Sequence, residues 1–287
     1  MTIIGARRIS YWVSGVLVAA SFLAVAVWGL KLGIDFTGGS LMEVEYKNTR
    51  PSVVLPDTLM QPVEEKGLIL RLPAIDEARH QAILSELRKA GELEEKQFTS
   101  IGPTIGAELK RKSVYAIILV FVMIVLYISW AFRQVSRPVA SWKYGIATLI
   151  ALVHDVSIPV GFFAVLGHFY GITVDTLFVT ALLTILGFSV HDTIVVFDRI
   201  RENLKKFGSR EPFENVVEAS LRQTIVRSIN TSLTVMLVML ALYFFGGASA
   251  KLFSLAILIG VFFGTYSSIF IASALVVSWN RWSLRRS

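Results

Sequence analysis

The stretch Thr184–Asn203, with the sequence TILGFSVHDTIVVFDRIREN, is an apolar run that contains a histidine and an aspartate and ends in charged residues. Such a run is typical of a membrane-spanning helix. A carboxylate at the centre of such a helix opposes insertion into a bilayer by roughly 2.5–3.5 kcal/mol. Chains rarely retain one unless it is paired, carries a proton or lines a pathway. Asp192 is therefore the first candidate for a functional residue, with His191 beside it.

Composition places the chain among multi-pass membrane proteins. Its 287 residues are 54% hydrophobic, with a mean hydropathy of +0.63, which is too apolar for an ordinary soluble protein. Apolar stretches of about 20 residues are long enough to cross the hydrocarbon core as helices. Six such stretches predict an all-α bundle of six transmembrane helices: Ile9–Leu30, Val114–Phe132, Tyr144–Leu166, Thr176–Phe197, Ile225–Phe245 and Leu252–Val277.

The first apolar stretch leaves two interpretations open. Arg7 and Arg8 precede it, and Ala24-Val25-Ala26 has the small residues of a cleavage site, as in a removable signal sequence. Its apolar length is closer to that of a spanning helix. The chain has no cysteine, so the exported part holds no disulfide and the chain no thiolate metal site.

The net charge of +7 is explained by topology. Residues 31–112 are nearly neutral, with twelve Lys/Arg against thirteen Asp/Glu, while the other basic residues gather at alternate ends of the helices. The positive-inside rule then predicts cytoplasmic termini and an exported segment 33–112. Nucleic acid is not an expected partner. The charged exit of the fourth helix predicts a cytoplasmic anchor formed by Asp198, Arg199, Arg201 and Glu202.

The exported segment is predicted to be a small α+β domain. Strands are expected at Leu41–Tyr46, Leu68–Leu72 and Lys96–Ile101, and a helix from an Asp76 cap through Ala90, with Gly91 as its stop. The segment has no cluster of His and carboxylates for a metal and no nucleophile with a paired histidine. We therefore expect no enzyme activity and no cofactor. The predicted organisation is a tail and first helix (1–32), the exported domain (33–112) and five further helices (113–287).

Two glycine-containing segments bracket the predicted domain. One precedes it at residues 33–40 and the other follows it at 102–109. Glycine permits positive φ and close approach of two backbones, so both segments are interpreted as tight structural junctions. A phosphate-binding loop is the alternative, but no Lys-Ser/Thr follows at the required spacing. The motif residues of the first segment are Gly33, Asp35, Phe36, Gly38 and Gly39.

Further polar residues lie within the apolar helices. Arg227, in the fifth helix, could meet Asp192 at a similar depth, either as a moving partner in proton binding or as a static ion pair. His154-Asp155, in the third helix, is either a structural polar contact or a proton site. A metal held by His154 and His191 is a third, weaker interpretation. Interhelical hydrogen bonds are expected from four smaller polar residues: Thr193, Asn230, Thr231 and Ser232.

Four motifs together resemble the SecD/SecF family of bacterial protein-export proteins, on the SecF side. They are GIDFTGGS at 33–40, ALVHDVSIPVGFFA at 151–164, SVHDTIVVFDRIREN at 189–203 and SINTSL at 228–233. The order of one helix, an exported domain and five helices also fits. This family belongs to the resistance–nodulation–division superfamily, in which two six-helix halves form one unit.

The resemblance implies a location, partners and an energy source. These are the bacterial inner membrane, a SecD-like six-helix partner, the SecYEG channel and SecA motor, unfolded preproteins in transit, and protons. Asp192 matches the family's intramembrane carboxylate, and the His154-Asp155 pair is also found in the family. At position 191 the family more often has Asn, so whether His191 joins the proton path stays open. Two alternatives remain: a proton-driven exporter half for small molecules or lipids, and a non-transporting assembly protein.

Overall fold

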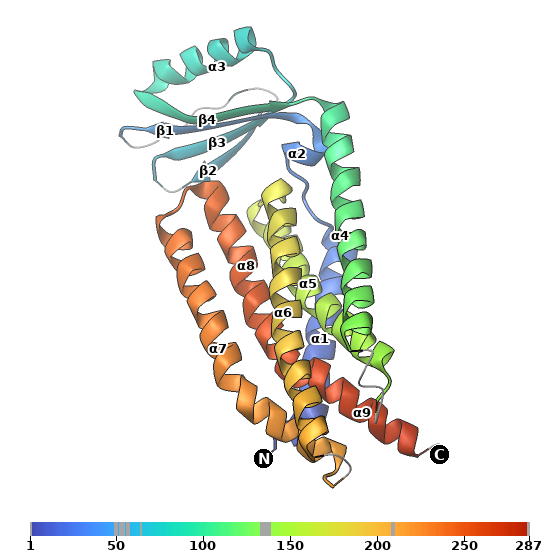
Figure 1. Cartoon of the computed structure of the whole chain (residues 1–287). Coiled ribbons are helices and arrows are strands. Elements are labelled where there is room, and N and C mark those ends of the chain that lie inside the picture. The colour runs from blue at the N-terminus through green and yellow to red at the C-terminus, as the bar shows by residue number, and fades with distance from the viewer. Residues whose placement is uncertain are drawn as a thin grey trace. The chain divides into compact units, whose positions relative to one another are not determined.

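The computed structural model describes residues 2–48, 51, 55, 58–63, 65–132, 139–207 and 210–285. The chain forms two compact units. Unit 1 comprises residues 1–29, 116–165 and 177–287, and unit 2 comprises residues 30–115 and 166–176. Figure 1 shows the helices and strands of both units.

Six helices are long and apolar enough to cross a membrane, as the sequence predicts. Each extends beyond its apolar stretch, because hydrophobicity marks only the part suited to lipid while the backbone continues as helix through polar residues. The last membrane helix is built from α8, a π-helical turn η2 and α9. The helical elements are η1 (Ile4–Ala6), α1 (Arg7–Trp28), α4 (Pro103–Ala131), α5 (Ser141–Tyr170), α6 (Thr176–Phe207), α7 (Phe213–Phe245), α8 (Ala248–Ser267), η2 (Ser268–Ala272) and α9 (Ser273–Leu284).

The interior of unit 1 is formed mainly by α5, α6 and the last membrane helix. In each of these helices at least half of the 18-residue apolar segment is buried, whereas the buried share is 6% in α4 and 11% in α7. Small residues allow close helix packing. A Cβ at Gly161 of α5 would lie 2.4 Å from Ser21 Cα of α1, and one at Gly260 of α8 would lie 2.2 Å from Ile185 Cδ1 of α6. The weakly buried α4 and α7 leave most of their apolar surface for lipid or a partner.

Unit 2 contains a four-stranded antiparallel sheet with strand order β2-β3-β1-β4. Its strands are β1 (Gly39–Tyr46), β2 (Leu59–Val63), β3 (Gly67–Leu72) and β4 (Leu93–Ile101), and its short helices are α2 (Ile34–Thr37) and α3 (Glu77–Ala90). The three predicted strands and the predicted helix are confirmed. The strand β2 was not predicted. It is an edge strand and contains Pro62, a residue that argues against a central strand but is tolerated at an edge.

The core of unit 2 lies between α3 and one face of the sheet (Figure 1). Leu68 and Leu70 of β3 are buried there, so the alternation of the strand places Ile69 and Arg71 on the opposite face. The predicted Asp76 cap is confirmed, because its side chain accepts a hydrogen bond from the backbone N–H of Arg79 at 2.9 Å. The main contributors to the core are Met42, Val44, Tyr46, Leu68, Leu70, Ile83, Leu84 and Leu87.

The connection between α5 and α6 also belongs to unit 2. Residues 31–33 pair with it as a short parallel bridge. The Gly33 N–H donates to the Val174 carbonyl at 2.8 Å, and the Val174 N–H donates to the Lys31 carbonyl at 2.8 Å. This pairing brings two chain segments together that are far apart in sequence.

Candidate functional site

The first buried carboxylate of unit 1 is Asp192, on α6. Its side chain is only 6% exposed, as expected for a charged group that faces the interior of a bundle. Its Oδ1 accepts a hydrogen bond from Ser228 Oγ of α7 at 2.5 Å, and its Oδ2 accepts one from Ser268 Oγ of η2. Asp192 is therefore held by neutral hydroxyl donors from two other helices.

The second buried carboxylate is Asp155, on α5, which is fully buried. Its Oδ2 accepts hydrogen bonds from Ser189 Oγ of α6 at 2.5 Å and from Ser267 Oγ of α8 at 2.8 Å. His154 Nδ1 lies 2.8 Å from Asp155 Oδ1, and its Nε2 is buried without a hydrogen-bond partner among the described residues. The predicted His154-Asp155 contact is thus formed, and two serines complete it.

Two consecutive serines connect these sites. Ser267 ends α8 and bonds Asp155, and Ser268 begins the π-helical turn η2 and bonds Asp192. Single π-helical turns within α-helices occur frequently at functional sites. The hydrogen bonds to the carboxylates from Ser189, Ser228, Ser267 and Ser268 were not predicted from the sequence. The sequence shows small polar residues within apolar helices, but it does not show toward which neighbouring helix each side chain points.

The four residues predicted to form interhelical hydrogen bonds have different outcomes. Ser232 of α7 is hydrogen-bonded to Thr265 of α8, so this prediction is confirmed. Thr193 is buried, but its hydroxyl has no partner among the described residues. Asn230 and Thr231 are exposed on α7.

Arg227 does not bond Asp192 in the part of the chain that the structure describes. The two acceptor oxygens of Asp192 face Ser228 and Ser268 instead. Successive residues of a helix point about 100° apart, so Ser228 faces the interior while Arg227 is exposed. Arg227 lines an open cleft of about 410 Å³ between α6 and α7, together with Asp198, Arg199, Glu202 and Gln223.

His191 is also exposed, although Asp192 beside it is buried. His154, in contrast, is buried between Asp155 and the rings of Phe263 and Tyr266. The two histidines therefore lie in different environments. Across the described ranges, no group of three His, Cys, Asp or Glu residues is placed to hold a metal ion.

The exposed sides of α6 and α7 carry a row of polar or small residues, which we call the polar face. Along α6 its members lie three, four or seven positions apart, and along α7 most lie three or four apart, so they share one side of each helix. They are Thr180, Thr184, Gly187, His191, Asp198 and Glu202 on α6, and Gln223, Arg227, Asn230, Thr231 and Thr234 on α7. A polar row in an otherwise apolar membrane helix normally faces protein or water, since such groups are costly in lipid.

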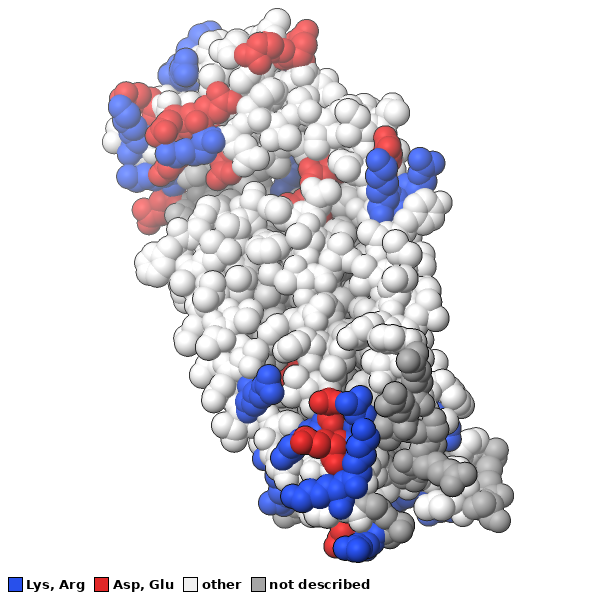
Figure 2. Space-filling view, in the orientation of Figure 1, with Lys and Arg blue, Asp and Glu red and all other residues white. Residues whose placement is uncertain are grey.

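The predicted anchor residues form ion pairs at the far end of α6. Arg199 pairs with Glu202 at 2.5 Å and Arg201 pairs with Asp198 at 3.1 Å, each within one helical turn. Exposed pairs of this kind contribute little stability. Arg199 Nε also donates to Gln223 Oε1 of α7 at 2.6 Å. Figure 2 shows Lys, Arg, Asp and Glu side chains grouped at the lower end of the view, where α6 ends in Figure 1.

The glycine segments of unit 2 pack directly against each other. Gly38 has a φ of +74°, and a Cβ there would lie 2.8 Å from Pro103 Cα. A Cβ at Gly106 would lie 2.8 Å from the Gly38 nitrogen, and the side chain of Phe36 is buried. The Gly38 N–H already donates to the Ile34 carbonyl at 2.8 Å. This geometry favours the structural junction over a phosphate-binding loop.

Two other residues of the motif join this junction to the α5–α6 connection. Asp35 Oδ2 accepts hydrogen bonds from the backbone N–H of Thr176, at 2.9 Å, and from its hydroxyl, at the first residue of α6. A carboxylate at this position stabilises the N-terminus of a helix. Gly39 has a φ of +123°, and a Cβ there would lie 2.7 Å from the Leu72 carbonyl oxygen. The glycines are therefore required for close backbone approach.

These features define a multi-pass membrane protein with buried carboxylates in its helical bundle and a small α+β unit. Two protein-family models identify its family. Residues 81–282 match the model "Protein export membrane protein SecD/SecF, C-terminal", and residues 25–49 match the model "SecD/SecF GG Motif". The chain therefore belongs to the SecD/SecF family.

Individual relatives agree with this assignment. The chain is 45% identical to the protein translocase subunit SecF of Thermobaculum terrenum, over 95% of this chain and 92% of that protein. It is 36% identical to the protein translocase subunit SecDF of Thermus thermophilus, over 94% of this chain and 37% of that longer protein. The crystal structure of SecDF from the same organism, described as a translocon-associated membrane protein, matches with a TM-score of 0.84 and 33% identity. That match covers 98% of this chain and 39% of the SecDF chain.

Proposed function

We propose that this chain acts as the SecF-like half of a proton-coupled protein translocase. The observation that carries the proposal is the position of Asp192, which is buried in the bundle and bonded by hydroxyl groups from α7 and η2. A small-molecule or lipid exporter is not favoured, since relatives that match nearly the whole chain are named as protein translocase subunits.

Asp192 would bind a proton on a carboxylate oxygen and later release it. The ionised form accepts hydrogen bonds from both Ser228 and Ser268, whereas protonation makes one oxygen a donor and removes the charge. Because the two serines lie on different helices, each proton transfer changes how α6 is held against α7 and the last membrane helix. That is a physical route from proton binding to helix movement.

The available energy is sufficient for such a switch. Moving one elementary charge through a potential of 100 mV supplies roughly 2.3 kcal/mol. This amount shifts a two-state equilibrium about fifty-fold. Arg227 and His191, on the polar face, would act at the entrance to the proton path, and the Asp155–His154 pair would either join the path or hold the helices in place.

A SecD-like six-helix protein is the proposed partner. The polar face of α6 and α7 needs a protein surface or water opposite it, and the Thermus SecDF relative is a longer chain of which this one spans 37%. Its name joins SecD and SecF, and we extend that pairing to the present chain. SecYEG, SecA and unfolded preproteins in transit are proposed as further partners on the family resemblance.

The proposed location is the bacterial inner membrane. Both termini would be cytoplasmic and residues 33–112 periplasmic, because basic residues are concentrated in the connections on the side of the termini. The ion pairs near the end of α6 would then lie at the cytoplasmic surface.

Export into membrane vesicles, with and without a proton gradient, tests the proposal. The Asp192→Asn protein should insert and bind its partner, but should lose the stimulation of export by the gradient, because an amide cannot titrate. Glu211→Gln changes an exposed carboxylate between α6 and α7, outside the polar face; it is the control and should retain the stimulation. Normal stimulation of the Asp192→Asn protein would remove Asp192 from the mechanism and favour an assembly role.

A further inference from the structure

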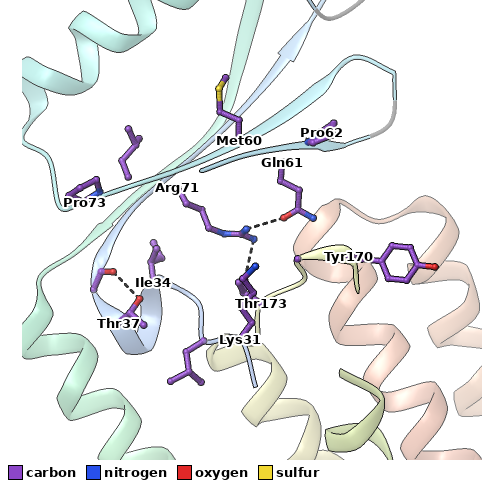
Figure 3. A pocket seen from close by; sticks show the side chains of 14 residues that line it. Lys31, Ile34, Thr37, Met60, Gln61, Pro62, Arg71, Pro73, Tyr170 and Thr173 are labelled. Carbon is purple, nitrogen blue, oxygen red and sulfur yellow. Dashed lines mark hydrogen bonds between the residues drawn. The ribbon is translucent and has the colours of Figure 1, made fainter. Parts of the chain in front are cut away.

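Unit 2 contains a cavity of about 530 Å³ below the edge of its sheet (Figure 3). This volume lies within the range of roughly 300–1,000 Å³ that is typical of ligand sites. Three parts of unit 2 line the cavity: the edge formed by β2 and β3, the segment that follows α1, and the start of the α5–α6 connection. Two of its described lining residues, Lys31 and Arg71, carry a positive charge, and none of them is acidic.

Arg71 is the central cation of this cavity. Its guanidinium donates to Gln61 Oε1 at 2.9 Å and to Thr173 Oγ1 at 3.1 Å, and Figure 3 shows it pointing between these two residues. Its Nε is buried and has no hydrogen-bond partner among the described residues. Burial lowers the pKa of Arg71, and no described carboxylate forms an ion pair that would oppose this effect. A partly buried guanidinium held by neutral acceptors retains the capacity to bind an anion.

Other donors converge on the same space. The exposed Lys31 has its ammonium beside Gly171, 3.8 Å from the position that a Cβ would occupy there. Gln61 accepts from Arg71 through its Oε1, which leaves its amide nitrogen able to donate to a ligand. The site therefore offers a fork of guanidinium donors, an ammonium and an amide, without a described acidic group to repel an anion.

The nature of the anion follows from donor geometry and from the surrounding residues. A guanidinium fork matches the oxygens of a phosphate group. Lys31 lies just beyond Trp28, where α1 ends, and Tyr170 is the last residue of α5, so both are close in sequence to membrane-spanning helices. The lining also includes two apolar residues of the segment that follows α1, Leu32 and Ile34, which suit the glycerol and upper acyl part of a lipid.

We propose that the Arg71 cavity binds a phosphate group, and that an anionic phospholipid headgroup supplies it. The apolar residues beside the two cations favour a lipid over free phosphate. An acidic side chain of a protein partner is the competing occupant, which the test below separates from a lipid.

The test uses the purified full chain in detergent with phosphatidylglycerol or phosphatidylcholine added, and counts retained lipids by native mass spectrometry. The wild type should retain phosphatidylglycerol in preference to phosphatidylcholine. Arg71→Gln should lower phosphatidylglycerol retention about tenfold, the order expected for loss of a charge-assisted contact. Arg88→Gln removes the same charge from the exposed side of α3 and should leave retention unchanged.

A second variant distinguishes loss of binding from misfolding, and a competition measurement identifies the source of the phosphate. Lys31→Gln changes an exposed side chain and should weaken retention several-fold while the circular dichroism spectrum stays that of the wild type. Competition by glycerol 3-phosphate or inorganic phosphate at similar concentrations would support the phosphate site with a soluble source. Equal retention by the wild type, Arg71→Gln and Lys31→Gln would overturn the proposal. It would also be overturned by an Arg71→Gln protein that keeps the lipid but loses its SecD-like partner, which would assign the cavity to a partner carboxylate.

Discussion

Ser267 and Ser268 are consecutive residues whose hydroxyl groups bind different carboxylates. Ser267 donates to Asp155 of α5 at 2.8 Å, and Ser268 donates to Asp192 of α6. The two buried acids are thus linked through a single peptide unit where α8 passes into the π-helical turn η2. A displacement of this turn that releases one carboxylate also moves the donor of the other.

This arrangement predicts that Ser268→Ala loses most of the stimulation of export by the proton gradient. Asp192 would keep Ser228 but lose one of its two hydroxyl donors, and hydrogen bonds to charged groups are worth about 1.5–3 kcal/mol. We expect gradient-dependent export to fall about tenfold, with export in the absence of a gradient unchanged. Ser268→Thr keeps a hydroxyl at the same position and should restore most of the stimulation. An unaltered gradient response in Ser268→Ala would exclude a role for this contact.

Ser267→Ala should act mainly on stability. Asp155 is fully buried, so removal of one donor leaves part of its hydrogen-bonding capacity unsatisfied, at a cost of about 1–3 kcal/mol. Thermal unfolding of the purified chain, followed by size-exclusion chromatography, should show a lower midpoint than the wild type. Thr234→Ala, on the exposed polar face, is the control and should unfold at the wild-type temperature.

The packing of the two glycine segments predicts that one of two nearby Gly→Ala substitutions lowers stability and the other does not. Gly106→Ala places a Cβ 2.8 Å from the Gly38 backbone nitrogen, so the two segments must separate, at about 1–3 kcal/mol of unfolding free energy. Gly102→Ala meets nothing within 4 Å and should change stability by less than about 0.5 kcal/mol. Chemical denaturation of both proteins checks this, and equal stabilities would contradict the packing described here.

Unit 2 contains a pH-sensitive contact at His80. Its ring stacks on Phe98 with centroids 3.8 Å apart, and its two nitrogens lie 3.1 Å from Glu77 and 2.8 Å from Glu95. Burial lowers the pKa of His80, but the hydrogen bonds to the two carboxylates outweigh it and leave the pKa above its usual value. The resulting stabilisation is fully present below about pH 6.5 and is lost as the pH rises through the raised folded-state pKa.

Hydrogen exchange of the full chain measures this effect. Peptides from α3 and β4 should exchange more slowly near pH 6 than near pH 8, after correction for the intrinsic rate. His80→Gln should abolish the difference, whereas His168→Gln, at an exposed position of the same unit, should keep it. A pH dependence that survives in His80→Gln would assign it to another group.

The proposed topology predicts the outcome of cysteine labelling, which is simple because the chain has no native cysteine. A cysteine at Lys89, exposed on α3, should react with a membrane-impermeant reagent added outside. A cysteine at Lys205, exposed near the end of α6, should react only after the membrane is opened. Labelling of the Lys205 position from outside would reverse the assignment.

Sequence alone predicted the features that depend on local patterns. The six membrane helices follow from the length of apolar stretches, and α3 follows from its Asp76 cap, helical spacing and Gly91 stop. Asp192 stood out because a carboxylate in an apolar helix is costly wherever the helix is placed. The strand β2 was missed, because Pro62 is acceptable only at an edge, and edge position is a property of the assembled sheet.

Tertiary structure alone decided which side chains meet. The rotation of α7 about its axis turns Ser228 toward Asp192 and leaves Arg227 exposed, although the two residues are adjacent in sequence. The approach of α8 selects Ser267 and Ser268 as donors, and the pairing of residues 31–33 with Val174 creates the cavity around Arg71. Periodicity identifies the faces of a helix or strand, but the partner of each face depends on packing between segments distant in the chain, which no local pattern encodes.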